Sequence, residues 1–275
     1  MPALARAVDA HAHVFGGEEF SFSSDALYTP HKNQMGTAKK FHEVLAAHDM
    51  THGLLVGAGP YGDDNRCMVQ AISESNGLFK GVALVKATIE ERELEKLKNQ
   101  GVVGIRMNLM GHGLRPLVEP GANVLLARLK SLDMYLQLHF QKAELVEAAP
   151  ILRKSGVKMI IDHFGRPDLT LGVQDKGYQE VLEFGKTGQA SIKLSGPFRS
   201  SVQGYPYTDV DPFIEAAIEA YKLDNCMWGS DWPFVRIEER MDYGPPATCL
   251  TRWLPDEGDR QKVLWETPAR LFGFN

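Results

Sequence analysis

Residues 81–109 read GVALVKATIEERELEKLKNQGVVGIRMNL and contain one full repeat of the pattern that decides the fold. Gly81–Val85 and Val103–Leu109 are short, almost continuously apolar runs, which are typical of strands buried on both faces of a parallel sheet. The charged segment between them, Glu90–Gln100, has the spacing of a helix with one solvated face. The stretch therefore predicts two parallel strands joined by a helix.

The same alternation occurs eight times along the 275 residues. The other apolar runs that predict strands are Ala7–Val14, Gly53–Ala58, Tyr135–Phe140, Val157–Phe164, Ala190–Ser195 and Asn225–Ser230. The other segments that predict helices are Thr37–Asp49, Asp64–Asn76, Asn123–Leu132, Ala143–Ser155, Lys176–Lys186, Asp211–Lys222 and Asp259–Phe272. Eight strand–helix units favour a closed (β/α)8 TIM barrel over an open sheet.

We expect this barrel to form a single domain over residues 1–275, since no linker or repeat suggests a second one. Long polar, Gly/Pro-rich loops are predicted after the first and eighth strands, at Gly16–Gly36 and Arg236–Gly258. No GxGxxG motif follows the first strand, so we expect no dinucleotide or other organic cofactor.

Composition narrows the class of protein further. The chain has 30 Lys and Arg against 35 Asp and Glu, a formal charge of −5, and 44% hydrophobic residues. These values predict a folded protein that binds neither nucleic acid nor membranes. Three separated cysteines and a Met1–Ala7 segment without a signal-peptide pattern predict a cytoplasmic location. The sequence is compatible with a homo-oligomer and does not define its size.

Polar side chains gather at the predicted carboxyl ends of the strands, where barrel enzymes carry their active sites. His11 and His13 end the first strand and, by alternation, point to the same face. His139 ends the fifth strand, His163 the sixth, and Asp231 follows the eighth. Each residue alone can be structural, but their coincidence at one barrel mouth predicts a catalytic site.

Four arginines suggest the charge of the substrate. Arg106 lies inside an apolar strand, and Arg115, Arg166 and Arg199 follow strands four, six and seven. Guanidinium groups bind carboxylates in a bidentate manner, so several of them at one mouth favour a carboxylated small molecule. The alternative for each arginine is an internal salt bridge, for example to Asp162.

Three blocks carry a resemblance to a known family: His11-Ala12-His13, Ile161–Pro167 (IDHFGRP) and Trp228–Pro233 (WGSDWP), followed by a closing segment Glu266–Phe274 (ETPARLFGF). Together they resemble the amidohydrolase superfamily, and within it the amidohydrolase-related branch that contains 2-pyrone-4,6-dicarboxylate lactonase and sugar lactonases. The resemblance runs from Val8 to Phe274.

The resemblance implies a hydrolase that opens a small carboxylated lactone: a pyrone dicarboxylate or muconolactone from aromatic degradation, or an aldonic or aldaric lactone. It implies that Asp231 is the general base for water and that His163, with His11 or His13, stabilises the oxyanion. Arg106, Arg166 and Arg199 match the branch's carboxylate-binding positions, and Arg115 is aligned less securely.

The resemblance leaves the metal open. His11, His13, His139 and Asp231 match one mononuclear pattern and would suit Zn or Mn. Parts of the lactonase branch need no metal, and His139 would then contact the substrate. The first alternative function is a metal-dependent decarboxylase of an aromatic or muconate-type acid. Hydrolysis of a C–N bond and a catalytically inactive binding barrel are further alternatives.

Overall fold

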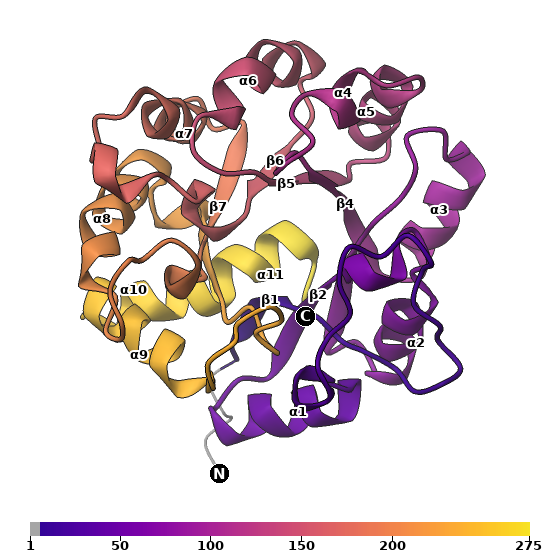
Figure 1. Cartoon of the computed structure of the whole chain (residues 1–275), viewed down its shortest axis with the longest axis horizontal. Coiled ribbons are helices and arrows are strands. Elements are labelled where there is room, and N and C mark those ends of the chain that lie inside the picture. The colour runs from indigo at the N-terminus through magenta and orange to yellow at the C-terminus, as the bar shows by residue number, and fades with distance from the viewer. Residues whose placement is uncertain (1–5) are drawn as a thin grey trace.

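The computed structural model describes residues 6–275, so most of the predicted Met1–Ala7 segment lies outside it. Eight parallel strands in the order β1 to β8 form one sheet at the centre (Figure 1). Every predicted strand overlaps an observed one, and the predicted (β/α)8 barrel is confirmed. The strands are β1 (Val8–Ala12), β2 (His52–Val56), β3 (Phe79–Ala83), β4 (Val102–Asn108), β5 (Tyr135–His139), β6 (Met159–Ile161), β7 (Ala190–Ser195) and β8 (Cys226–Gly229).

Helices follow the strands and surround them. They are α1 (Ala38–Ala47), α2 (Arg66–Glu74), α3 (Glu91–Asn99), α4 (Arg115–Val118), α5 (Ala122–Ser131), α6 (Glu144–Ser155), α7 (Lys176–Lys186), α8 (Asp211–Tyr221), α9 (Gly244–Trp253), α10 (Glu257–Gln261) and α11 (Thr267–Phe272). A π-helical segment, Lys262–Glu266, joins the last two. The stretch Arg236–Gly258, predicted as a loop, instead contains α9, whose Pro245 and Pro246 occupy the first turn where proline is tolerated.

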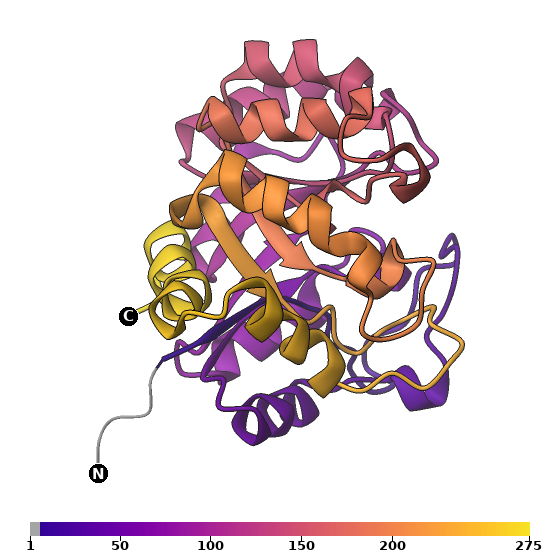
Figure 2. The ribbon, with the colours of Figure 1, turned by 90° about the vertical axis from the view of Figure 1, so that its left-hand side faces the viewer.

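The amino-terminal end of the barrel is closed by apolar side chains. Val8, Ala10, Leu54, Val82, Ile160 and Met227 from the strands pack with Phe272 and Phe274 from the chain's end. Figure 2 shows α11 at this end, while the long loops after β1 and β8 lie at the opposite end. Because buried apolar side chains fill this end of the barrel, we expect a ligand to enter from the carboxyl ends of the strands.

The barrel closes where β1 meets β8. The backbone nitrogen of Asp231 donates to the His11 carbonyl at 2.8 Å, and that of His13 donates to the Trp232 carbonyl at 2.8 Å. Gly229 allows this approach, since a Cβ there would lie 2.7 Å from the backbone nitrogen of His11. The seam therefore fixes His11, His13 and Asp231 relative to one another through backbone hydrogen bonds.

Strand β1 contains an irregularity in its register that sets the direction of its histidine side chains. Asp9 pairs with Gly53 and Ala12 with Leu55, so three steps along β1 match two along β2, as in a bulge. The buried Asp9 carboxylate accepts from Ser230 and from the hydroxyl of Tyr243 beside α9. His11, two residues later, instead faces Asp162 and Lys193 inside the barrel. The bulge thus separates a structural carboxylate from the histidine side chains.

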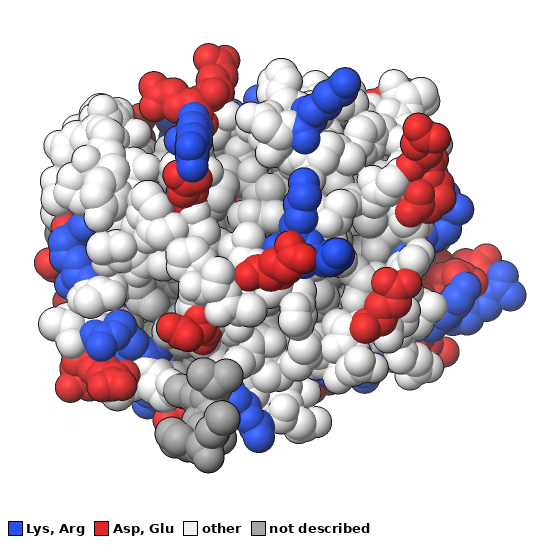
Figure 3. All heavy atoms as spheres, turned by 90° about the horizontal axis from the view of Figure 1, so that it is seen from below, with Lys and Arg blue, Asp and Glu red and all other residues white. Residues whose placement is uncertain are grey.

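One face of the molecule carries charges of both signs. On this face, shown in Figure 3, small groups of Lys and Arg lie near small groups of Asp and Glu, with uncharged areas between them. None of the helices within residues 6–275 has the length and apolar character required to cross a lipid bilayer.

Candidate active site

Asp231 lies at the centre of the barrel mouth, directly after β8. Its carboxylate is buried, with Oδ1 3.7 Å from Nε2 of His11 and 3.6 Å from Nε2 of His13. The other oxygen, Oδ2, lies 3.8 Å from Nε2 of His163. Strands β1, β6 and β8 therefore bring three imidazoles around one carboxylate, as the sequence predicts.

The two residues that turn into the mouth at the ends of β6 and β8 have strained backbones. Asp231 has φ 64° and His163 has φ 49°, in the left-handed region that costs L-residues about 1–2 kcal/mol. His163 begins a short 3-10 turn (His163–Gly165), and its ring lies against Gly196, where a Cβ would be 2.8 Å from Nδ1. Such strain persists where the surrounding structure holds it, and it is concentrated at functional sites.

Hydrogen bonds orient the histidine rings. Nδ1 of His13 donates to the Val56 carbonyl at 2.8 Å, which leaves the lone pair of Nε2 facing Asp231. Nδ1 of His163 lies 2.9 Å from the Ser195 hydroxyl. Burial lowers the pKa of His11 and His163, and it lowers the pKa of His13 to about 3. All three rings are therefore neutral at pH 7.

Asp231 is ionised in spite of its burial. Burial by itself raises the pKa of this carboxyl group, but the charge of the Arg199 guanidinium has the largest opposing effect and holds the pKa below the ordinary range. The strongest contact is a hydrogen bond from Nε of Arg199 to Oδ2. An ionised carboxylate beside neutral imidazoles can accept a proton from water.

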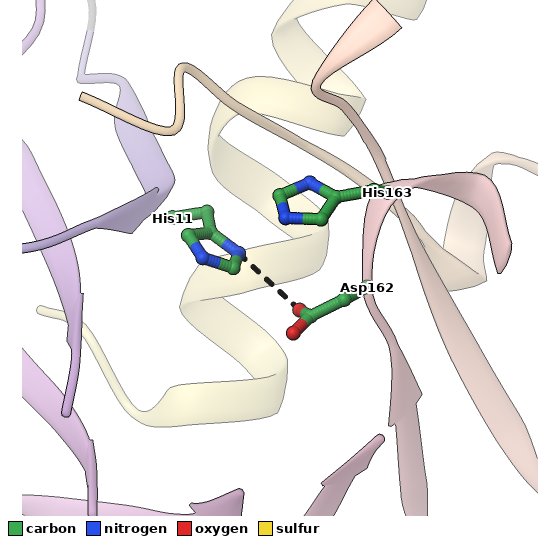
Figure 4. Close-up of side chains that lie close together, drawn as sticks. All are labelled: His11, Asp162 and His163. Atoms are coloured by element: carbon green, nitrogen blue, oxygen red, sulfur yellow. Dashed lines mark ion pairs between the residues drawn. The ribbon is translucent and has the colours of Figure 1, made fainter. Parts of the chain in front are cut away.

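A second buried carboxylate, Asp162, lies one layer deeper. Its Oδ2 accepts from Nε of Arg106 at 2.9 Å and from the Gln137 amide at 3.0 Å. Its Oδ1 lies 3.2 Å from Nδ1 of His11, the contact drawn as a dashed line in Figure 4, and 3.4 Å from Nζ of Lys193. Burial raises the pKa of Asp162, but the charges of Lys193 and Arg106 hold it well below its usual value.

A cavity of about 680 Å³ opens above Asp231. Its lining includes His13, His139, His163, Asp231 and four arginines, Arg106, Arg166, Arg199 and Arg236. The volume is in the range of small-molecule sites. Arg106 and Arg199 are ion-paired with Asp162 and Asp231, as the alternative interpretation of internal salt bridges anticipates.

Arg166 differs from these two paired arginines. Within residues 6–275 it forms no ion pair, its Nε is buried without a hydrogen-bond partner, and Nη2 donates to the Arg199 carbonyl at 3.3 Å. Burial lowers its pKa to about 10, so it remains charged at neutral pH. A half-buried cation that faces a cavity without an internal ion pair is suited to an anionic ligand.

The structure brings together all but one of the predicted site residues. His139 lines the cavity, with Nδ1 buried and without a partner, and its ring is 5.9 Å from that of His163. Arg115, at the start of α4, is exposed and is not among the residues that line the cavity. Its predicted role in substrate binding has no support in its position.

Sequence reasoning missed the layer around Asp162, in particular Lys193 and Gln137. Lys193 is a fully buried lysine in the middle of β7. The signal was available, because a cation within an apolar strand is the same feature that identifies Arg106. Its partners come from β5 and β6, however, and only the closed barrel brings those strands together.

A metal ion could be held by part of this site. His11, His13 and Asp231 each offer one ligand atom, and these atoms lie within 4.8 Å of one another. Nε2 of His11 is buried without a hydrogen-bond partner, and Nε2 of His13 has a free lone pair, so the donor set fits a divalent cation. The group does not include His139, which the sequence analysis placed among the ligands.

Comparison with known proteins places this barrel and its site in one family. Residues 8–274 match the Amidohydrolase family, and the chain belongs to it. It is 32% identical to a 2-pyrone-4,6-dicarboxylate hydrolase from Comamonas testosteroni, over 98% of this chain and 90% of that protein. It is 30% identical to a 4-sulfomuconolactone hydrolase from Rhizobium radiobacter, over 96% and 89%.

A solved structure shows the same architecture. It is that of a probable 2-pyrone-4,6-dicarboxylic acid hydrolase from Acinetobacter baumannii with citric acid bound, which superposes with a TM-score of 0.88 at 32% identity. The alignment covers 98% of this chain and 99% of that one. The resemblance inferred from the three sequence blocks is therefore confirmed.

Proposed function

We propose that this protein is a lactonase that hydrolyses a small carboxylated lactone, of the pyrone-dicarboxylate, muconolactone or aldaric kind. The observation that carries the proposal is the buried, ionised Asp231 among three neutral histidines, at the base of a cavity lined by four arginines. The names of the similar hydrolases support the same class of reaction. In this proposal the single barrel carries the whole activity, and it acts on a small molecule.

The reaction begins with a water held against Asp231. Asp231 takes one proton as the water oxygen attacks the lactone carbonyl carbon, and the carbonyl oxygen becomes an oxyanion. His163 donates to this oxyanion through Nε2 while the Ser195 hydroxyl donates to its Nδ1. The ring C–O bond then breaks, and protonated Asp231 returns its proton to the leaving oxygen. The sum is lactone plus water to a hydroxy acid.

The arginines have different roles in this proposal. Arg199 keeps Asp231 ionised, and Arg106 holds Asp162. Arg166, which forms no internal ion pair within the described chain, binds a carboxylate of the substrate, and His139 contacts the same molecule from its side of the cavity. The arginine side chains thereby orient the ring over Asp231.

A metal-assisted form of the same reaction is the second candidate, favoured by the cluster of three ligand atoms. One divalent cation such as Zn²⁺ or Mn²⁺ would be held by His11, His13 and Asp231, and when bound it would supply a Lewis acid for the carbonyl. Elemental analysis of protein purified without chelator separates the two forms. About one equivalent of metal, with activity lost on chelation, would support this candidate.

The test of the proposed function is a panel of purified lactones and acids, assayed for proton release and by chromatography. Ring opening of a carboxylated lactone is the expected result. No ring opening across the panel by folded protein would refute the proposal, and release of CO₂ would favour the decarboxylase alternative.

We also infer a cytoplasmic location, supported by free, buried Cys67, Cys226 and Cys249.

A further inference from the structure

Lys193 is a buried cation that the proposed reaction does not use. It lies on β7 with no solvent exposure, between the apolar plug and the cavity. A lysine in such a place is unfavourable unless its charge and its three hydrogen atoms are all satisfied. The contacts that satisfy it show what it does.

The ammonium group has three partners. Nζ donates to Oε1 of Gln137 at 2.8 Å, lies 3.4 Å from Oδ1 of Asp162, and lies 3.3 Å from Nδ1 of His11. The Asp162 carboxylate and the Gln137 amide oxygen that face this group favour its ammonium form. An ammonium has no lone pair, so in the contact with His11 it must be the donor.

This contact determines where His11 carries its proton. A neutral imidazole has one N–H, and if Nδ1 accepts from Lys193 the hydrogen must be on Nε2. Nε2 of His11 is the atom that lies 3.7 Å from Asp231 and has no other partner. Asp162 competes for the same Nδ1 at 3.2 Å, where it would hold the opposite tautomer (Figure 4). Among the described residues, however, Oδ1, the Asp162 oxygen that faces Nδ1, makes no hydrogen bond, whereas Nζ of Lys193 has hydrogen-bond geometry to the same nitrogen.

We propose that Lys193 is a positioning residue that, held by Gln137 and Asp162, donates to Nδ1 of His11 and so directs the His11 N–H at Nε2 into the active site. His11 is then a hydrogen-bond donor beside Asp231, while His13, tied to the Val56 carbonyl, is an acceptor. A water between them receives one hydrogen bond and donates another, which orients it for attack. The catalytic consequence rests on the proposed function; the tautomer does not.

The inference also bears on metal binding. A cation at the group of His11, His13 and Asp231 needs a lone pair on Nε2 of His11, which this tautomer lacks, and it is repelled by the nearby ammonium. Replacing Lys193 by Met removes the repulsion and lets Nδ1 donate to Asp162. The result is the carboxylate–histidine arrangement that strengthens metal ligands. Lys193→Met should therefore bind zinc more tightly than the wild type.

The test combines three measurements. Side-chain ¹H–¹⁵N spectra of ¹⁵N-histidine-labelled protein, with His11 assigned through His11→Asn, should show the His11 proton on Nε2 in the wild type and on Nδ1 in Lys193→Met. Zinc titration by calorimetry, with His13→Asn as the blank, should show affinity at least about tenfold higher in Lys193→Met. With the lactone substrate, kcat should fall by about 10- to 100-fold while KM stays unchanged.

Ile192→Val is the matched control. Ile192 is the neighbouring residue of β7, and it packs in the main hydrophobic core outside the plug. This substitution should leave the tautomer, the zinc affinity and kcat unaltered. Lys193→Leu, which also removes both the donor and the charge, serves if the Met variant does not fold. A wild-type His11 proton on Nδ1, or a Lys193 variant with unchanged tautomer, zinc affinity and kcat, would overturn the inference. A protein that shows the tautomer shift but opens no lactone would refute only the proposed function.

Discussion

The two ends of the barrel are built from opposite kinds of residue. At the amino-terminal end Val8, Leu54, Ile160 and Phe272 pack into a buried apolar plug. The carboxyl-terminal end instead carries carboxylates, histidines and arginines. They contact one another, but some of their buried polar atoms have no hydrogen-bond partner among the described residues. The plug stabilises the fold, and the mouth retains charge for a reaction. Substitutions at the two ends should therefore separate stability from activity.

The largest effect is expected at Asp231 in the mouth. Asp231→Asn keeps the size of the side chain but removes the base, so kcat should fall by about 10³- to 10⁴-fold. The fold should persist, but the Tm should fall, because the substitution leaves Arg199 without its ion-pair partner. Steady-state kinetics and calorimetry check this, with Asp168→Asn at the surface ion pair to Lys142 as the control. Near-normal kcat in Asp231→Asn would exclude Asp231 as the base.

At the plug we expect a substitution to lower stability and to leave activity unchanged. Phe272→Ala leaves a cavity against Tyr135 and Phe274 and should lower the free energy of unfolding by about 3–5 kcal/mol. KM and kcat at 25 °C should stay close to the wild-type values, because the plug does not line the cavity. Urea unfolding and kinetics on the same preparation measure both. A large change in KM would show that the two ends are coupled.

Within the mouth, Arg166 should control substrate charge. Arg166→Met removes a cation that has no internal ion pair in the described structure, so a dicarboxylated lactone should lose about 1.5–3 kcal/mol of binding, seen as a higher KM. A neutral lactone should be unaffected. Equal changes for both substrates would mean that Arg166 is structural.

The smallest effect is a shift in pH dependence on replacing Arg199. Arg199 lowers the pKa of Asp231, and the ionised form is the active base, so wild-type kcat/KM should persist to low pH. Arg199→Met removes this stabilisation of the carboxylate, and the Asp231 pKa should rise. The acid limb of the kcat/KM profile should therefore move to higher pH. If the acid limb of the kcat/KM profile stays at the same pH, a group other than Asp231 determines its position.

The sequence predicts the plug and the mouth unequally well. The strands and the coincidence of His11, His13, His163 and Asp231 follow from local pattern and from the barrel's geometry. The sequence left the internal pairing of Arg106 and Arg199 as one of two alternatives, because each carboxylate partner follows a different strand. The bulge in β1 that turns Asp9 away from the histidines has no signal in residue type. Helix α9 was missed because Gly244, Pro245 and Pro246 are typical of loops as well as of a first helical turn.

One measurement tests the central claim directly: the product formed by the wild-type protein in H₂¹⁸O, analysed by mass spectrometry. If water activated at Asp231 attacks the lactone carbonyl, the product gains one ¹⁸O atom, located in the new carboxylate, and one proton is released per turnover. A product without added oxygen, or one that has lost CO₂, would contradict the account of this barrel as a lactonase.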